Sequence, residues 1–394
     1  NTDFTYSLPS ASIAAGATEM LRVTFKPRHN LAYNSELIFV LADGSEFRVD
    51  LVGNGKYEGT YYSATFNKSY QDLKDELKTI LAAGYSNQGY SGARDKMYGD
   101  IDNVAGKVTC VYTGREATFN TRSGANSSSF NCEHTWPQSK FNSNEPEKAD
   151  IHHLFPTDVN ANSRRGSYPF GVVTGTPSWT EGGSKQGGSL FEPRDEQKGA
   201  TARAMIYFAI RYQDYGSFIG SQETLLKQWH TDNQPTAWDV QRNEKIFGYQ
   251  KNRNPFVDHP EFIERINKIA ATDTKPVIKE AEIAQSTIEY GFVRNNERRN
   301  IYITNTVNTN WTGVSAATTS DNNLKIVSSA NSASAGEALQ IVVDFLGLPD
   351  GDYTDNLTLD LNNEAGKTIT IPVSFSIGTA SAADIASQEL SVFY

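Results

Sequence analysis

Residues 130–141 read FNCEHTWPQSKF and bring a thiol, a carboxylate and an imidazole together just before a Trp-Pro pair. Adjacent side chains on a regular strand point to opposite faces, so Glu133 and His134 can serve one site only where the strand ends. The turn expected at Pro137 supplies such an end. An isolated Glu-His pair is more often an accident of a loop, so the neighbouring segments decide whether this one carries chemistry.

Residues 149–171, ADIHHLFPTDVNANSRRGSYPFG, add a histidine pair, an Asn-rich stretch and two adjacent arginines. His152 has a plain interpretation as a core histidine that is hydrogen-bonded to Asp150 or to a backbone carbonyl. Asn160 and Asn162 also have one, because Asn favours turns and helix caps. The cap interpretation is stronger for Asn160 than for Asn162.

These side chains have the chemistry for hydrolysis of a phosphodiester with one hard metal ion. A carboxylate and an amide oxygen suit Mg²⁺, which takes few protein ligands and keeps several waters. A neutral histidine can take a proton from the attacking water near neutral pH. A zinc hydrolase is excluded, because no His-Glu-x-x-His or comparable ligand spacing occurs in the chain.

The charge distribution permits a nucleic-acid substrate in the middle of the chain. The formal net charge is −10, which by itself argues against phosphate binding. Residues 58–270, however, hold 24 Lys and Arg against 25 Asp and Glu, whereas the flanks hold 12 against 21. The acidity therefore belongs mostly to the ends, and the middle can present a local basic face.

The length and the apolar pattern indicate a multidomain protein without a membrane span. A chain of 394 residues exceeds what one hydrophobic core usually serves. No apolar run approaches the roughly 18 residues that cross a bilayer. The first residues, NTDFTYSLPS, are neither basic nor apolar, so we expect any secretion signal to lie outside this chain.

The two ends resemble each other. Residues 15–55 and 335–378 both run through Ala-Gly, an alternating strand, a Pro-containing turn, a Tyr, a second alternating strand, a Gly turn and a last strand. Alternation of period two between regularly spaced turns is typical of β-sandwiches. Both ends resemble the immunoglobulin-like modules of bacterial surface and secreted proteins, and the first copy corresponds to the second half of such a module.

The middle has helical periodicity and short strands. Apolar residues recur at helical spacing in SYQDLKDELKTILAAGY and KGATARAMIYFAIRYQ, and SQETLLKQWHTDN and TAWDVQRNEKIFGYQ are also expected to be helical. Two short strands, GKVTCVYTG and EATFN, precede residues 130–141. This order predicts an α+β domain with a small sheet among helices.

Cys110 and Cys132 are the only cysteines in the sequence. Two thiols cannot form a metal cluster, which leaves one disulfide or two buried thiols. We expect the disulfide, because other features suggest an exported protein.

Four ordered segments carry a specific resemblance: CEHTWPQS, DIHHLFPTDVNANSRRGSYPFG, FEPRDEQKGATARAMIYFAIRY and NRNPFVDHPEF. Together they resemble the bacterial endonuclease I family, which comprises secreted or periplasmic nucleases with a ββα-metal (His-Me finger) site. The resemblance implies that His134 is the general base and Glu133 a metal ligand. It implies Asn162 as the second ligand, six residues after Pro156, and one Mg²⁺, with Ca²⁺ or Mn²⁺ as alternative occupants.

The chain also departs from the family pattern. Lys148 stands where some relatives carry an acid, and the short stretch between Gln138 and Asp150 lacks the insertion whose Arg binds the scissile phosphate in other relatives. We expect Arg203 to take that phosphate bidentately, with an ion pair to Glu192 as the alternative.

Arg164 and Arg165 are further candidates for substrate binding. Arg164 carries the same guanidinium as Arg203, and Arg165 falls where the family places an arginine. Both are therefore expected to contact the phosphate backbone.

The sequence thus predicts an endonuclease I-like domain at residues 58–272 between immunoglobulin-like segments at 1–57 and 277–377, with a tail at 378–394 that starts a further element. The expected function is secreted, Mg²⁺-dependent cleavage of DNA and RNA through phosphate contacts, without sequence specificity and with 5′-phosphate products. The alternative is a cell-surface binding or adhesion protein whose nuclease-like domain is inactive. We expect a secreted, periplasmic or cell-surface location.

Overall fold

The computed structural model describes residues 3–10, 12–14, 16–40, 46–213, 216–274, 287–293, 295–305, 310–319, 323–334, 337–361, 367–378 and 391–393. The chain forms two compact units. One comprises residues 68–274, and the other comprises residues 1–67 and 275–394.

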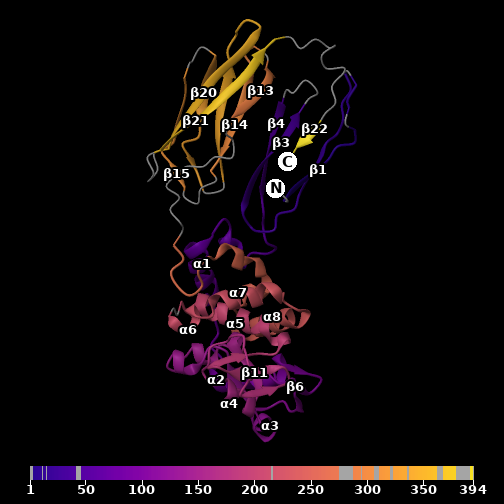
Figure 1. Ribbon diagram of the computed structural model, residues 1–394, viewed down its shortest axis with the longest axis vertical. Helices are drawn as coiled ribbons and strands as arrows, with labels where there is room; N and C mark the ends of the chain where they lie inside the picture. The colour runs from indigo at the N-terminus through magenta and orange to yellow at the C-terminus, as the bar shows by residue number, and fades with distance from the viewer. Residues whose placement is uncertain are drawn as a thin grey trace. The chain divides into compact units, whose positions relative to one another are not determined.

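In the unit of residues 1–67 and 275–394, the amino-terminal part is built from two antiparallel strand pairs. Strand β1 (Phe4–Ser7) pairs with β2 (Arg22–Phe25), and β3 (Ala32–Val40) pairs with β4 (Glu46–Asn54). Strand β22 (Ser391–Phe393) lies antiparallel to β3 (Figure 1). The tail that was expected to start a further element therefore contributes its described strand to the amino-terminal sheet.

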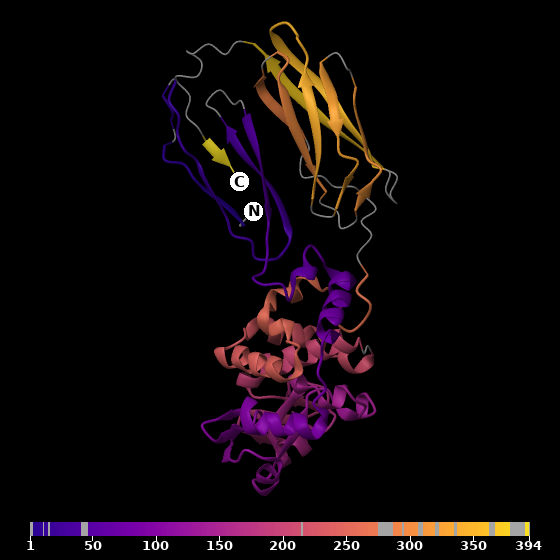
Figure 2. The ribbon, with the colours of Figure 1, turned by 180° about the vertical axis from the view of Figure 1, so that it is seen from behind.

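Two sheets share one hydrophobic core in the carboxyl-terminal part of this unit. Their strands run in the orders β13-β21-β20-β16 and β14-β19-β17. The bounds are Ile288–Val293 for β13, Arg298–Thr304 for β14, Ser315–Thr318 for β16, Leu324–Ser329 for β17, Ala338–Phe345 for β19, Gly351–Leu361 for β20 and Lys367–Ile377 for β21. Inward residues of both sheets form the core, among them Ile341, Leu359 and Ile371, which are completely buried. The strands gathered around this core are the orange and yellow ones in Figure 2, apart from the short yellow arrow of β22.

The unit of residues 68–274 is α+β. Its main helices are α1 (Tyr70–Ala82), α2 (Gly89–Lys96), α3 (Arg122–Ser127), α4 (Val159–Arg165), α5 (Asp195–Tyr212), α7 (Glu223–Asp232) and α8 (Ala237–Gln250). The four helices predicted from the sequence are confirmed as α1, α5, α7 and α8. Helix α5 is buried along most of its length and packs against α1 and α7 (Figure 1). None of the helices in the described ranges is long and apolar enough to span a membrane.

Short strands among the described residues of this unit form three small sheets. Strands β5 (Asn103–Val104), β6 (Lys107–Thr109) and β7 (Glu116–Thr118) make one of them, and β10 (Trp179–Glu181), β11 (Ser184–Gly187) and β12 (Leu190–Glu192) make another. The third sheet is the pair of β8 (Phe130–His134) and β9 (Leu154–Asp158), which is antiparallel with Glu133 opposite Phe155.

Helix α4 follows β9 directly. Asp158 ends the strand and caps the helix, because its side chain accepts hydrogen bonds from the backbone N–H groups of Asn160 and Ala161. Two strands and a helix thus form a continuous ββα element, with the Glu-His pair at the end of its first strand.

Candidate active site

Glu133 is a buried carboxylate with two partners on the same oxygen. Its side chain is 2% exposed, and Oε1 accepts a hydrogen bond of 2.8 Å from the Tyr112 hydroxyl. The Arg165 Nε lies 2.8 Å from the same Oε1. Burial raises the pKa of Glu133 to about 7, although the Arg165 charge and the Tyr112 hydrogen bond act in the opposite direction. The contacts of Oε1 fix the carboxylate in orientation.

His134 has a defined tautomer. Its Nε2 lies 3.1 Å from the Lys148 carbonyl oxygen, and its Nδ1 lies 3.2 Å from Nε2 of Gln138. A carbonyl oxygen can only accept a hydrogen bond, so Nε2 must carry the proton. Nδ1 then has the lone pair and accepts a hydrogen bond from the Gln138 amide. Burial, together with the neighbouring His153, lowers the pKa of His134 to about 3. The imidazole is therefore neutral near pH 7, with Nδ1 as its basic atom.

Asn162 lies beside the peptide that precedes Glu133. It is on α4, and its Nδ2 donates hydrogen bonds to Asn131 Oδ1 at 2.8 Å and to the Cys132 carbonyl at 3.2 Å. Both hydrogen bonds use the amide nitrogen of Asn162, and neither uses its side-chain oxygen. Asn160, in contrast, is exposed in the first turn of the same helix.

The histidines that follow are structural. His152 Nε2 lies 3.1 Å from the Asn252 carbonyl, and His153 Nε2 lies 2.6 Å from the Glu147 carbonyl. Both imidazoles are buried, and burial lowers the pKa of each to about 4. The plain interpretation of His152 as a core histidine on a backbone carbonyl is correct. His153 also packs against His134, with the ring centroids 5.5 Å apart.

The donor set suits a hard cation that keeps most of its water. Glu133 offers a carboxylate and Asn162 an amide oxygen, and these are the oxygen ligands of Mg²⁺ and Ca²⁺ sites. No group of three or more His, Cys, Asp or Glu side chains in the described ranges is arranged to hold a metal. A site of nitrogen and sulfur ligands is therefore not formed there, whereas the two oxygen ligands fit one hydrated cation.

The two adjacent arginines have different environments. Arg165 is completely buried, and besides its pairing with Glu133 it donates hydrogen bonds to the carbonyls of Thr135 and Gly166. The guanidinium that was expected to contact the phosphate backbone is thus buried in this structure and is bound by protein groups. Arg164, one position earlier, is exposed.

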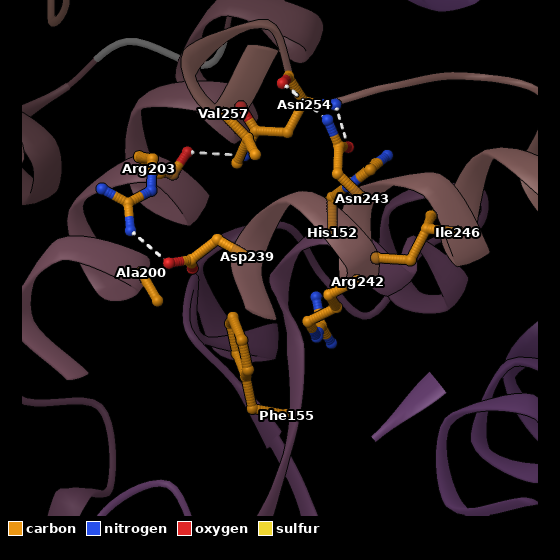
Figure 3. A pocket seen from close by; sticks show the side chains of 10 residues that line it. All are labelled: His152, Phe155, Ala200, Arg203, Asp239, Arg242, Asn243, Ile246, Asn254 and Val257. Carbon is orange, nitrogen blue, oxygen red and sulfur yellow. Dashed lines mark hydrogen bonds and ion pairs between the residues drawn. The ribbon is translucent and has the colours of Figure 1, made fainter. Parts of the chain in front are cut away.

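Arg203 was expected to bind a phosphate or to pair with Glu192, and the structure gives it another environment. Its side chain is 3% exposed on α5, where Nη2 lies 3.2 Å from Asp239 Oδ2 (Figure 3). Its Nη1 donates to the Asn233 carbonyl. The adjoining cavity measures about 20 Å³, which is room for a single water and far too small for a phosphodiester. Glu192 pairs with Lys198 instead. Arg203 therefore joins α5 to α8 in this structure, and the space beside it does not admit a phosphodiester.

The predicted disulfide is wrong, because both cysteines are free and buried. Cys110 Sγ accepts hydrogen bonds from the backbone N–H groups of Asp158 and Thr113. Cys132 Sγ donates to the Glu133 carbonyl within its own strand, and burial raises the pKa of this thiol to about 12. Each sulfur thus has its own partners, and the strand that presents Glu133 is fixed without a covalent link.

Several residues of the site were not singled out from the sequence. Tyr112 orients Glu133, and Gln138 occupies the basic nitrogen of His134. Tyr90 of α2 lies against His134, with ring centroids 5.2 Å apart. Gln138 stands four residues after His134 in the quoted motif, so spacing provided a signal for it, whereas Tyr90 and Tyr112 come from distant segments that only the fold brings close.

Comparisons with known proteins show which family the chain is similar to. The family model described as Endonuclease I matches residues 67–261. The chain is 33% identical over 229 residues to an extracellular ribonuclease of Bacillus amyloliquefaciens, covering 52% of this chain and 78% of that protein. A comparison with an extracellular ribonuclease of Bacillus subtilis (strain 168) gives the same identity over 228 residues and the same two coverages. An extracellular deoxyribonuclease of Aeromonas hydrophila is 32% identical over 118 residues, covering 28% of this chain and 50% of that protein. The chain therefore belongs to the endonuclease I family and is a nuclease.

Proposed function

We propose that this protein is a secreted endonuclease that hydrolyses phosphodiester bonds of DNA and RNA and leaves 5′-phosphate ends, with His134 as the general base. The observation that carries the proposal is that Asn162 hydrogen-bonds to the backbone beside Glu133, next to His134. The Nε2 of His134 contacts the Lys148 carbonyl, which leaves Nδ1 as the basic atom. Relatives named as ribonuclease and as deoxyribonuclease support both substrates. Their extracellular location supports secretion.

The proton transfer follows from the tautomer. A water that replaces the Gln138 amide at Nδ1 would donate its proton to that nitrogen as its oxygen attacks the phosphorus. The Lys148 carbonyl holds the Nε2 proton and so stabilises the imidazolium that forms. An incoming phosphodiester also places negative charge beside the imidazole. This charge raises the pKa of His134 and so makes Nδ1 a better proton acceptor.

Nucleases of this family are generally metal-dependent, and Glu133 and Asn162 are the residues that would hold a cation here. Tyr112 and Arg165 bind Oε1 of Glu133, so we assign Oε2 to the metal. Mg²⁺, with Ca²⁺ or Mn²⁺ as substitutes, would supply positive charge to the phosphate and to the leaving oxygen when bound. The chain's own contribution is to orient the two oxygen ligands and to keep His134 neutral.

Cleavage without sequence preference follows from the kind of contact. Phosphate contacts carry no base information, and neither the sequence nor the ββα element suggests a helix or strand that reads base edges. The β-sheet regions at both ends of the chain are proposed to be immunoglobulin-like modules. The alternative of an inactive adhesion protein is not favoured, because Glu133, His134 and Asn162 are all present.

A cleavage assay tests this function. Supercoiled plasmid and a structured RNA are incubated with the full chain in Mg²⁺ and then in EDTA. We expect nicking and degradation of both polymers in Mg²⁺, with 5′-phosphate ends, and no cleavage in EDTA. Intact polymers in Mg²⁺, Ca²⁺ and Mn²⁺ would reject the proposal.

A further inference from the structure

The proposed mechanism needs a cationic side chain that binds the scissile phosphate. The ion pairs in the unit of residues 68–274 show which arginines already have a carboxylate partner. Most of its arginines are neutralised by carboxylates: Arg115, Arg122, Arg165, Arg194, Arg203, Arg211, Arg242 and Arg253. Arg94 and Arg164 form no ion pair with any residue that the structure describes. Arg265 is 6% exposed and donates to the Lys68 carbonyl, so it is not accessible to an external anion. Arg94 and Arg164 are therefore the candidate arginines for binding such an anion.

Arg94 is connected to His134 through an aromatic ring. It lies four residues after Tyr90 on α2, so the two side chains share one helix face. The Arg94 guanidinium carbon is 4.0 Å from the Tyr90 ring centroid, and the same ring is 5.2 Å from the His134 imidazole. Arg164 has no comparable contact to His134 among the described residues.

A second cation meets the same ring. Lys148 Nζ lies 5.2 Å from the Tyr90 ring centroid, and the backbone carbonyl of the same residue holds Nε2 of His134. Helix α2 packs against the turn that carries Lys148. No ion pair or hydrogen bond engages its ammonium within the described ranges. Two positive charges without an ion pair therefore lie against the Tyr90 ring, and that ring contacts the general base.

The donors of Arg94 match a phosphate. Its Nε donates a weak hydrogen bond of 3.4 Å to the Tyr90 carbonyl, which anchors the side chain on its own helix. The two terminal NH₂ groups have no partner in the described part of the chain. A planar guanidinium offers parallel N–H donors that fit two oxygens of one phosphate, whereas an ammonium acts as a point charge.

We propose that Arg94, assisted by Lys148, binds the phosphodiester next to His134. The Tyr90 ring is the platform that keeps both cations there. This inference rests on the proposed nuclease function and deepens it, because it assigns the phosphate-binding group of the same site to an element upstream of the ββα element. Arg94 would take the place of the insertion arginine that the sequence lacks and of Arg203, which is buried elsewhere.

The test compares Arg94→Gln, Arg94→Lys and a matched control, Arg122→Gln, in the full chain. Arg122 also contacts α2, through Asp95 and Ser91, but its charge is already compensated by Asp95. The control therefore removes one positive charge and one anchor of the same helix. Cleavage of a fluorogenic single-stranded oligonucleotide gives kcat and KM. Anisotropy with the same oligonucleotide, in a His134→Ala background, gives the salt dependence of binding.

We expect Arg94→Gln to lower kcat/KM by about 10²-fold, the usual scale for removing one pre-organised donor at a developing charge. The slope of log K against log salt should fall in magnitude by about 0.7, as for one lost phosphate contact on a single strand. Arg94→Lys should recover part of kcat/KM and the whole salt slope, because it keeps the charge but loses the fork. Arg122→Gln should retain the parent values of both quantities.

Two results would overturn the inference. One is an Arg94→Gln protein with the parent's kcat/KM and salt slope, and the other is an equal loss in Arg122→Gln, which would indicate a structural role of α2. A parent chain that does not cleave the oligonucleotide would instead reject the proposed function, and this inference with it.

Discussion

Arg165 and Glu133 form an ion pair in which Nε lies 2.8 Å from Oε1, with side chains that are 0% and 2% exposed. Arg165 is the last residue of α4, and Glu133 is the next-to-last residue of β8, so the pair ties the helix of the ββα element to its first strand. The carboxylate that we assign to the metal is thus already compensated by a fixed cation. This compensation keeps it from being an isolated buried charge.

Arg165→Met should destabilise the unit of residues 68–274 by about 3 to 5 kcal/mol, because it leaves Glu133 buried without its partner. Urea unfolding followed by tryptophan fluorescence measures the change. Arg122→Gln, which breaks the partly exposed pair with Asp95, should cost less than about 1 kcal/mol. Equal losses of unfolding free energy for the two variants would show that the buried pair contributes no more to stability than the partly exposed one.

Asn162→Ala should raise the metal concentration that gives half-maximal cleavage, whereas Asn160→Ala should leave it unchanged. The reason is that Asn162 lies against the backbone of β8 and Asn160 is exposed to solvent. Calorimetric titration with Mn²⁺ measures binding independently of activity. The assignment fails if Asn160→Ala weakens Mn²⁺ binding and Asn162→Ala does not.

The two cysteines should behave as protected free thiols. Protein purified without reductant should react with two equivalents of a thiol reagent after denaturation, and slowly or not at all when native, because both sulfurs are buried. The elevated pKa of Cys132 also disfavours the reactive thiolate. A denatured, unreduced protein without reactive thiols would restore the disulfide.

Buried histidines should make the protein less stable as the pH falls below 6.5. Burial lowers the pKa of His230 from 6.5 to about 4, so the unfolded chain takes up the proton first as the pH falls. Its contribution to stability is complete above pH 6.5 and is lost between about pH 6.5 and 4, at up to about 1.4 kcal/mol per pH unit. His230→Gln keeps a donor for the Pro260 carbonyl and should flatten the curve. Urea unfolding at several pH values compares the slopes, and identical slopes would contradict the assignment.

The sequence was sufficient for the features that depend on local spacing. Glu133 and His134 were expected at the end of a strand, and β8 ends at His134. Asn162 was chosen through the family resemblance, and its role as a metal ligand stays a prediction. The helices α1, α5, α7 and α8 were likewise predictable, since each has apolar residues at helical spacing or clear terminal signals.

Features that depend on long-range packing were not predictable. The partner of Arg203 is Asp239 and not Glu192, because α5 packs where α8 begins, and no local pattern carries that information. Cys110 and Cys132 are both close to β9 but bond to different backbone groups, a difference that depends on side-chain direction. Arg94 lies forty residues before His134 in the sequence, so only the fold shows that they are neighbours.

Cleavage of supercoiled plasmid and RNA by His134→Ala is the most direct test of the account. The variant should lose about 10² to 10⁴ in rate, the usual contribution of a general base. It should remain folded, with a lower urea midpoint because a buried ring is removed, and it should keep the parent's Mn²⁺ affinity because Glu133 and Asn162 are unchanged. A His134→Ala protein that cleaves both polymers at the parent rate would contradict the central claim that this imidazole takes the proton.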